Sequence, residues 1–267
     1  MCELYGLSAK NKKQLNRDLK EFFGHSADHP DGWGLALPEG PSPYMKKAPE
    51  PAFKSREVRD FLSGPRSARV CLAHIRKATI GYDEYCNTHP FLGTDISGRT
   101  WILIHNGTIF EGSLLSPYMY RQKGWTDSER ILLCLIARIN AAARKAERTL
   151  EDQERFQVLE TLVRELAPAN KLNLLIYDGT LLYAHYNARD TLHVRKEEDA
   201  VTFSTVPLAE GEWEEAPWEE APWEEAPFCR LTAWKEGTLF YEGKEHEHEY
   251  IPDETSIRAL FMAYAGL

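Results

Sequence analysis

Two consecutive stretches decide the fold class, TDSERILLCLIARINAAARKAER at residues 126–148 and EDQERFQVLETLVRELA at residues 151–167. Their patterns predict two adjacent helices. Thr126 or Asp127 is suited to cap the first helix, and Glu129 adds a favourable negative charge to its first turn. The strands expected on either side of this pair then define the architecture.

Upstream of the helix pair, ARVCLAHIR (68–76) and TWILIHNG (100–107) are apolar runs bounded by glycine and charged residues, which indicates buried strands. Downstream, KLNLLIYDGTLLYAHYN (171–187) predicts a hairpin that turns at Asp178 and Gly179. Further strand signals follow in AVTFSTV (200–206) and CRLTAWKEGTLFYEG (229–243). Strands, two helices and more strands predict a layered α+β domain, not a parallel doubly wound sheet.

The N-terminal part adds two short strands and two helices to this pattern. Residues 2–7 and GWGLALP (32–38) read as strands, and they flank a helix expected from about Lys12 to Phe23. REVRDFL (56–62) has helical periodicity and ends before a Ser-Gly-Pro sequence.

Composition restricts the functions that this chain can have. At 267 residues, 43% hydrophobic and 27% charged, it is expected to form one globular domain over residues 2–267. A net charge of −9 with no stripe of Lys or Arg disfavours nucleic acid as a partner. The most apolar stretch, ILLCLIARI, is too short to span a bilayer, so no membrane span is expected. Five cysteines without a CxxC pair indicate reduced thiols in the cytoplasm.

One segment has the character of an insertion. WEEAP occurs three times in tandem from Trp213 to Pro227, which is too short a repeat for a solenoid. We expect a surface loop at about 212–227, extended by its prolines and solvated by its glutamates. A docking motif with exposed Trp anchors is the less favoured interpretation.

A cysteine stands directly behind the initiator methionine. Removal of Met1 would leave Cys2 with a free α-amino group beside its thiol. A cysteine has a pKa of about 8.5 and an α-amino group one of about 7.7–8.0, so both titrate near neutrality. The amine is therefore a plausible base for a thiol nucleophile. The alternative is that Cys2 merely begins a strand as a small hydrophobe.

Polar residues gather near the ends of predicted strands in DGWG (31–34), HIRKAT (74–79), NTHPF (87–91) and IHNGTI (104–109), and TDSE opens the first long helix. Each of these has an ordinary structural explanation. Arg76 could be a surface charge, His89 a core histidine, Asn106 and Gly107 a turn, and Asp127 a helix cap.

As a set, these motifs resemble the glutaminase domain of class-II glutamine amidotransferases, members of the N-terminal-nucleophile hydrolase superfamily. Cys2 followed by HIRKAT, NTHPF, HNGTI and an aspartate at a helix start has the order of that family, over residues 2 to about 130. VTFSTVPL (201–208) resembles a later strand of the stand-alone YafJ-type subgroup. The resemblance implies a four-layer α/β/β/α sandwich with two mostly antiparallel sheets.

The resemblance also implies a chemistry. Cys2 would attack the side-chain amide of glutamine and release ammonia, and water would hydrolyse the γ-glutamyl thioester. The Asn106 amide and the Gly107 N–H would form the oxyanion hole. Arg76 would bind the substrate α-carboxylate bidentately, and Asp127 would pair with its α-ammonium.

Thr79 and His89 match pocket positions of the family, and DGWG corresponds to the strand entry beside the nucleophile. Thr79 and His89 are expected to hydrogen-bond the substrate or to hold its loop. Gly32 and Trp33 of DGWG are expected to be walls of the site. The resemblance calls for no metal and no other cofactor.

Several alternatives stay open at this point. No synthase domain is evident in the sequence, so ammonia would pass to a separate synthase subunit, or the enzyme would simply hydrolyse a γ-glutamyl amide. Some relatives in the stand-alone subgroup cleave γ-glutamyl bonds in small thiol compounds. A non-catalytic binding domain with the same fold would predict loss of the nucleophile or the oxyanion donors, which are present here.

Two other enzyme classes are weaker interpretations. KEHEHEY (244–250) offers His246 and His248 as zinc ligands, but a site needs further ligands, so the segment is interpreted as a solvated charged run. A cysteine protease would need a histidine base, and no local signature selects one.

Overall fold

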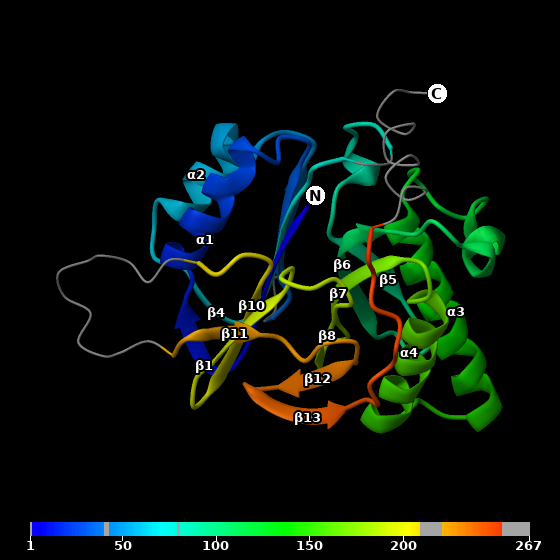
Figure 1. Cartoon of the computed structure of the whole chain (residues 1–267). Coiled ribbons are helices and arrows are strands. Elements are labelled where there is room, and N and C mark those ends of the chain that lie inside the picture. The colour runs from blue at the N-terminus through cyan, green and yellow to red at the C-terminus, as the bar shows by residue number, and fades with distance from the viewer. Residues whose placement is uncertain (1, 40–42, 79–80, 209–220, 253–267) are drawn as a thin grey trace.

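The computed structural model describes residues 2–39, 43–78, 81–208 and 221–252, and two antiparallel sheets form its centre (Figure 1). The seven-stranded sheet has the order β11 (Trp223–Glu225), β9 (His193–Lys196), β10 (Ala200–Ser204), β1 (Glu3–Gln14), β4 (Ser67–Ile75), β2 (Trp33–Leu37) and β3 (Tyr44–Ala48). The six-stranded sheet has the order β13 (Thr238–Glu242), β12 (Thr232–Lys235), β8 (Leu182–His185), β7 (Lys171–Tyr177), β6 (Thr100–Thr108) and β5 (Phe91–Thr94). Neighbouring strands in both sheets run antiparallel.

Helices cover the outer face of each sheet (Figure 1). The helices α1 (Asn16–Gly24) and α2 (Arg56–Leu62) pack on the seven-stranded sheet, and α3 (Asp127–Ala146) and α4 (Asp152–Leu166) pack on the six-stranded sheet. In the part of the chain that the structure describes, four short 3-10 helices lie in the connections, at His25–Ala27, Ala52–Lys54, Tyr85–Asn87 and Ser113–Tyr118. The predicted four-layer α/β/β/α sandwich is confirmed.

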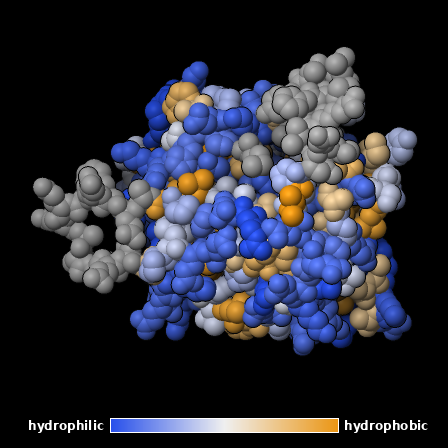
Figure 2. Space-filling view, viewed as in Figure 1, coloured by the Kyte–Doolittle hydropathy of each residue, from blue (hydrophilic) through white to orange (hydrophobic). Residues whose placement is uncertain are grey.

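The apolar core is divided by these layers into three clusters. One lies between α1, α2 and the seven-stranded sheet, and a second between α3, α4 and the six-stranded sheet. The third fills the space between the two sheets and includes Leu4, Leu72, Ile104, Leu175 and Phe203. On the face shown in Figure 2, hydrophilic residues cover most of the surface and hydrophobic residues form only small scattered patches.

Most elements expected from local patterns are present. Thr126 caps α3, its hydroxyl accepting the Glu129 N–H at 3.3 Å. The hairpin of β7 and β8 turns where predicted, with Gly179 at a φ of +89° that favours glycine. All five cysteines are free thiols. In the described ranges, no helix is long and apolar enough to cross a membrane.

The first helix begins later than expected. Residues 8–14, which we expected to lead into a helix from Lys12, instead continue β1, and α1 starts at Asn16. A register shift between Ser8 and Lys13 lets β1 keep its pairing with β4 to Gln14. The Lys13 ammonium also binds Glu197 at 2.8 Å, so contacts distant in sequence override the local helical pattern.

The WEEAP segment departs from the loop expected at 212–227. Residues 209–220 lie outside the described residues. In the third copy, Trp223–Glu225 forms the edge strand β11 on β9, so the loop prediction is wrong there. The Trp223 indole N–H donates to the Leu208 carbonyl at 3.1 Å, and the Arg195 guanidinium lies 4.9 Å from its ring centroid. A pairing partner that is remote in sequence therefore turns this copy into a strand.

Candidate active site

The predicted nucleophile and the predicted oxyanion donor face one space. Leu4 and Ile104 line the core between the sheets. Side chains alternate between the faces of a strand. Cys2, two residues before Leu4, and Asn106, two residues after Ile104, are therefore directed into the same inter-sheet space. Leu4 pairs with His74 of β4, whose ring contacts the His105 carbonyl of β6 at 3.2 Å, so the Cys2 and Asn106 side chains lie at one end of the sandwich.

Cys2 is half-buried, and its thiol donates a weak hydrogen bond to the Lys77 carbonyl at an Sγ–O distance of 3.5 Å. Burial raises the pKa of the Cys2 thiol because desolvation disfavours the thiolate. The positive charges of the amino terminus, Arg76 and Lys171 act in the opposite direction on this pKa. The thiol thus lies in a desolvated but electropositive setting.

Asn106 has a buried donor without an acceptor. Its side chain is 2% exposed, and its Nδ2 has no hydrogen-bond partner among the described residues. An unsatisfied buried donor costs about 1–3 kcal/mol and is rare in folded proteins. Such a group at the predicted oxyanion position is available for a substrate oxygen.

Gly107 allows the close approach of β6 and β7. A Cβ atom at this position would lie 1.9 Å from the Lys171 carbonyl oxygen and 2.4 Å from the His105 ring Nε2. Only glycine fits at this point of the strand pair. The residue expected to supply the backbone oxyanion donor therefore has a strict steric requirement.

Arg76 directly follows β4, and its side chain is almost fully buried. Its backbone N–H donates to the Gly32 carbonyl at 2.8 Å. The guanidinium donates from Nη1 to the Asp83 carboxylate at 2.9 Å and from Nη2 to the Gly81 carbonyl at 2.9 Å. Arg76, the residue expected to bind the substrate α-carboxylate, is therefore paired with a carboxylate of its own chain in this structure.

Asp127 is the first residue of α3 and connects this helix to the end of β6. Its Oδ2 accepts the Ile109 N–H at 2.7 Å, and its Oδ1 accepts the Ser128 N–H at 2.8 Å. Asp127 is 5% exposed. These bonds hold the segment that follows Gly107, so Asp127 has a structural role in addition to any part in substrate binding.

His89 lies against His74, with ring centroids 4.0 Å apart. Burial lowers the pKa of His74 to about 3 and that of His89 well below its ordinary value. His74 contacts the His105 carbonyl through Nε2 at 3.2 Å, whereas neither ring nitrogen of His89 has a partner among the described residues. Both rings are therefore neutral. Thr79, the other predicted pocket residue, lies outside the described residues.

Trp33 does not line this site. It belongs to the cluster under α1 and α2, where its ring lies 6.0 Å from Phe23, and it is fully buried. The alternation of β2 turns Trp33 away from the inter-sheet space, so the expectation of a pocket wall is wrong for it. Gly32 contacts the site region through its backbone bond to Arg76.

No sequence motif indicated that Lys171 lies near this site. This lysine is the first residue of β7, pairs with Thr108 of β6, and is 4% exposed. Burial lowers the pKa of Lys171 to about 8, and the charge of Cys2 opposes this shift. The one local signal was a lysine at the head of an otherwise apolar strand, KLNLLIY. Nothing in that signal connected it to Cys2.

The segment KEHEHEY is not simply a solvated run, because His246 is 6% exposed. The His248 N–H donates to His246 Nδ1 at 3.2 Å, and His185 Nδ1 donates to the Leu172 carbonyl at 2.7 Å. The 2.9 Å contact between the two Nε2 atoms is then a bond from His246 to His185. Over the described residues, no three His, Cys, Asp or Glu side chains are grouped to hold a metal ion.

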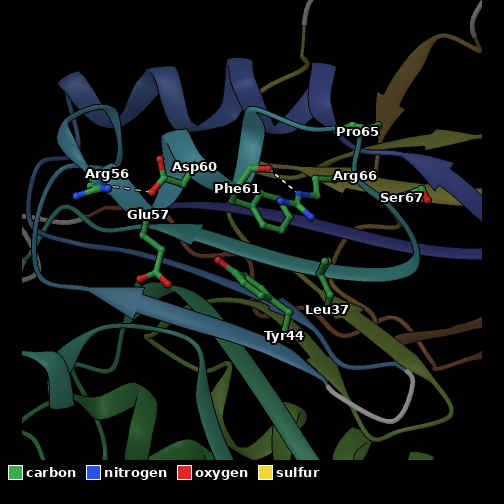
Figure 3. A pocket seen from close by; sticks show the side chains of 9 residues that line it. All are labelled: Leu37, Tyr44, Arg56, Glu57, Asp60, Phe61, Pro65, Arg66 and Ser67. Carbon is green, nitrogen blue, oxygen red and sulfur yellow. Dashed lines mark hydrogen bonds and ion pairs between the residues drawn. The ribbon is translucent and has the colours of Figure 1, made fainter.

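Two open cavities lie away from these residues. One of about 700 Å³, between α2 and the ends of β2 and β3, is lined among others by Leu37, Tyr44 and Arg66 (Figure 3). The other, of about 880 Å³, includes Arg69 and Tyr177. Both adjoin the opposite ends of the strands from Cys2, and neither is lined by a predicted site residue.

Comparison with known proteins bears on this arrangement. Residues 1–210 match the family described as class-II glutamine amidotransferases. YafJ of Escherichia coli K12 is 31% identical over 188 residues, which cover 69% of this chain and 72% of that protein. An uncharacterized protein of Methanocaldococcus jannaschii is 31% identical over 203 residues, 73% of this chain and 54% of that protein. The match thus spans about half of the archaeal protein.

Solved structures share the fold. A predicted glutamine amidotransferase of Pseudomonas aeruginosa PA01 matches with a TM-score of 0.58 at 22% identity, over 90% of this chain and 100% of that chain. The glutamine phosphoribosylpyrophosphate amidotransferase of B. subtilis matches with a TM-score of 0.60 at 15% identity, over 92% of this chain and 50% of that chain. At these identities the likeness concerns the fold.

Proposed function

The chain belongs to the class-II glutamine amidotransferase family, and from this premise we propose that it cleaves the side-chain amide of glutamine or of a γ-glutamyl compound. Cys2 is the nucleophile, after removal of Met1 has freed its α-amino group. The observation that carries the proposal is the buried Asn106 Nδ2, which has no partner among the described residues and faces the space that Cys2 enters.

The reaction proceeds through a thioester. The α-amine of Cys2 takes the thiol proton, and the sulfur attacks the amide carbonyl carbon. The carbonyl oxygen becomes an oxyanion that accepts hydrogen bonds from Asn106 Nδ2 and the Gly107 N–H. As the intermediate collapses, the C–N bond breaks and the α-ammonium returns its proton to the leaving nitrogen, which departs as ammonia.

A water molecule completes the cycle. The α-amine accepts a proton from the water as its oxygen attacks the γ-glutamyl thioester. The C–S bond then breaks, the sulfur regains its proton, and glutamate leaves. The neutral rings of His74 and His89 add no positive charge to the site, so the side-chain cations that act on Cys2 among the described residues are Arg76 and Lys171.

The ends of the substrate require two opposite charges. Arg76 binds the α-carboxylate in place of Asp83, whose carboxylate accepts a single hydrogen bond from Nη1 at 2.9 Å in this structure. Asp127 pairs with the α-ammonium, and Thr79 and His89 contact the substrate or its loop. Ammonia is then released or passed to a separate synthase subunit.

The test is alkylation by 6-diazo-5-oxo-norleucine, a reactive glutamine analogue, followed by intact-mass and peptide analysis. We expect a chain without Met1 that carries one adduct on Cys2, and excess glutamine should prevent the adduct. Cys2→Ala should abolish labelling, whereas Cys86→Ala, which removes another partly accessible thiol, should not. A chain that has lost Met1 and leaves Cys2 unmodified would contradict the proposal.

The substrate class requires a second measurement. Ammonia release from glutamine should be compared with the release of the amine from γ-glutamyl derivatives of small thiol compounds. A higher kcat/KM for the thiol compounds would assign the chain to γ-glutamyl amide hydrolysis, with the same nucleophile and oxyanion donors.

A further inference from the structure

Lys171 places a cation at the active-site end of the space between the sheets. Lys171 and Leu175 are four residues apart on β7, so their side chains lie on the same face of the strand. Leu175 lines the core between the sheets, and the Lys171 side chain is therefore directed toward that space. Across the strand pair it lies opposite Thr108, two positions beyond Asn106 on β6. Lys171 is 4% exposed, so bulk water screens its charge only weakly.

The thiol of Cys2 is the titratable partner of this cation. Leu4, two residues after Cys2, pairs with His74, whose ring contacts the His105 carbonyl of β6 at 3.2 Å. Cys2 and Lys171 therefore enter the inter-sheet space at the same end of β6. The positive charge of Lys171 lowers the pKa of the Cys2 thiol. Coulomb interactions gain strength in such desolvated surroundings. The other charged groups that act on Cys2 are the amino terminus and Arg76. The His105 ring lies on the opposite face of β6, where it contacts Ser128 of α3 and the backbone carbonyl of Lys171 at 3.3 Å.

We propose that the ammonium of Lys171 stabilises the thiolate of Cys2 and is a further functional residue of the proposed reaction. The inference rests on the proposed function for its meaning in catalysis. Lys171 forms no bond to the substrate and gives up no proton. The thiol proton still goes to the α-amine, and the lysine lowers the free energy of the charged sulfur that remains.

The buried position gives this cation a particular pH range. Burial lowers the pKa of Lys171 to about 8, so the ammonium is present at pH 7 and is lost in alkaline solution. The support for the thiolate is therefore greatest near neutrality. Arginine at the same position would keep its charge at every pH of the experiment.

The test measures how fast iodoacetamide alkylates Cys2 from pH 6 to pH 10, by peptide mass analysis, in the full chain without Met1. Wild type, Lys171→Met and Lys171→Arg are compared. Lys46→Met, which removes an exposed lysine ion-paired with Glu57, is the matched control for net charge. Cys86 in the same samples is an internal reference.

We expect Lys171→Met to raise the apparent pKa of the Cys2 thiol by about one unit, which slows alkylation roughly tenfold at pH 7. The difference should vanish near pH 10, where wild-type Lys171 is neutral. Lys171→Arg should retain the wild-type rate at pH 7. Lys46→Met and the rate at Cys86 should be unchanged.

Two results would overturn the inference. The first is an unchanged pH profile of Cys2 in Lys171→Met. The second is a rate reduced by the same factor at every pH, which would indicate a purely structural effect. If Lys171→Met unfolds, as circular dichroism would show, wild type is compared with Lys171→Arg instead. Arginine keeps its charge in alkaline solution, so the stabilisation of the Cys2 thiolate should not weaken there in this variant. An arginine variant with the wild-type pH profile would then overturn the inference.

Failure of this inference is distinguishable from failure of the proposed function. Iodoacetamide reports the ionisation of Cys2 whether or not the chain turns over glutamine. A normal adduct with the glutamine analogue and an unchanged profile in Lys171→Met would remove the lysine alone from the mechanism.

Discussion

The guanidinium of Arg76 and the carboxylate of Asp83 form an ion pair at 2.9 Å, in which the arginine side chain is 3% exposed and the aspartate side chain 54% exposed. The arginine is therefore fixed by its surroundings, whereas the aspartate approaches it from the solvent side. In the proposed reaction, a substrate α-carboxylate has to displace Asp83 from this position.

Asp83→Asn should lower KM for glutamine, because the variant removes a competitor for Arg76. A pair with a solvent-exposed member is worth up to about 1 kcal/mol, so the decrease should reach at most about fivefold. Steady-state ammonia release measures it. Asp60→Asn removes an exposed carboxylate 3.4 Å from Arg56 and should leave KM unchanged. An increase in KM for Asp83→Asn would show that this residue helps to organise the site.

Asn106→Ala should lower kcat by about 10²–10³, since one oxyanion donor is lost. Its free energy of unfolding should not decrease through lost hydrogen bonding, because Nδ2 makes no hydrogen bond among the described residues and the variant removes the cost of an unpaired buried donor. Asn173, its partner in the strand register, is the matched control. Its Nδ2 donates to the Thr191 hydroxyl at 2.7 Å and its Oδ1 accepts the Asn187 N–H at 3.3 Å.

Asn173→Ala should therefore show the opposite pattern, a free energy of unfolding lower by about 1–3 kcal/mol with kcat nearly retained. Urea unfolding and glutaminase assays on both variants give the comparison. Equal losses of kcat in the two variants would contradict a specific role for the Asn106 amide.

Gly107→Ala should disrupt the pairing of β6 and β7, because the new methyl group would lie 1.9 Å from the Lys171 carbonyl oxygen. Overpacking of this kind costs about 1–3 kcal/mol or more. Gly64→Ala is the control, since its added Cβ meets nothing within 4 Å. Thermal unfolding of both variants is the measurement, and a fully stable Gly107→Ala would show that the strands separate there at little cost.

Acid should destabilise the fold through its buried neutral histidines. Burial lowers the pKa of His185 to about 3 and that of His246 to about 4, from an ordinary value of 6.5. Below pH 6.5 the unfolded chain takes up protons that the folded state does not, so stability falls with decreasing pH. The loss due to His246 is complete at about pH 4.

His246→Gln tests this dependence. Removing one such ring should reduce the slope of unfolding free energy against pH, between pH 6.5 and 4, by at most about 1.4 kcal/mol per pH unit. Urea unfolding at a series of pH values measures the slope. An unaltered slope would mean that His246 is protonated in the folded protein over this range.

The elements predicted correctly are those whose signals are local. The periodicity of α3 and α4, the cap at Thr126 and the turn at Gly179 depend on neighbours within a few residues. The strands β3, β5, β9 and β11 carried no such signal and were missed. They are short, and their pairing partners rather than their own residues define them.

The site divides in the same way. The order of the motifs was sufficient to name Cys2, Asn106 and Gly107 as candidates, and strand alternation directs the first two into one space. The same alternation excludes Trp33, which lies one residue out of phase with that face. A shift of one residue along β2 decides whether a side chain faces the core under the helices or the space between the sheets, and the motif DGWG alone does not show which.

The sequence alone named the candidate residues: a thiol directly behind Met1, an amide and a glycine at a strand end, and an arginine and an aspartate suited to the two charges of a glutamine. It also determined the helices and the central strands, because hydrophobic periodicity acts over a few residues. The tertiary structure added that Lys171 enters the inter-sheet space near Asn106, toward which Cys2 is also directed, and that Arg76 is paired with Asp83. The first relationship depends on the packing of two sheets, which brings together residues that are far apart in the chain. The second depends on how the segment after β4 folds, because Asp83 lies only seven residues beyond Arg76.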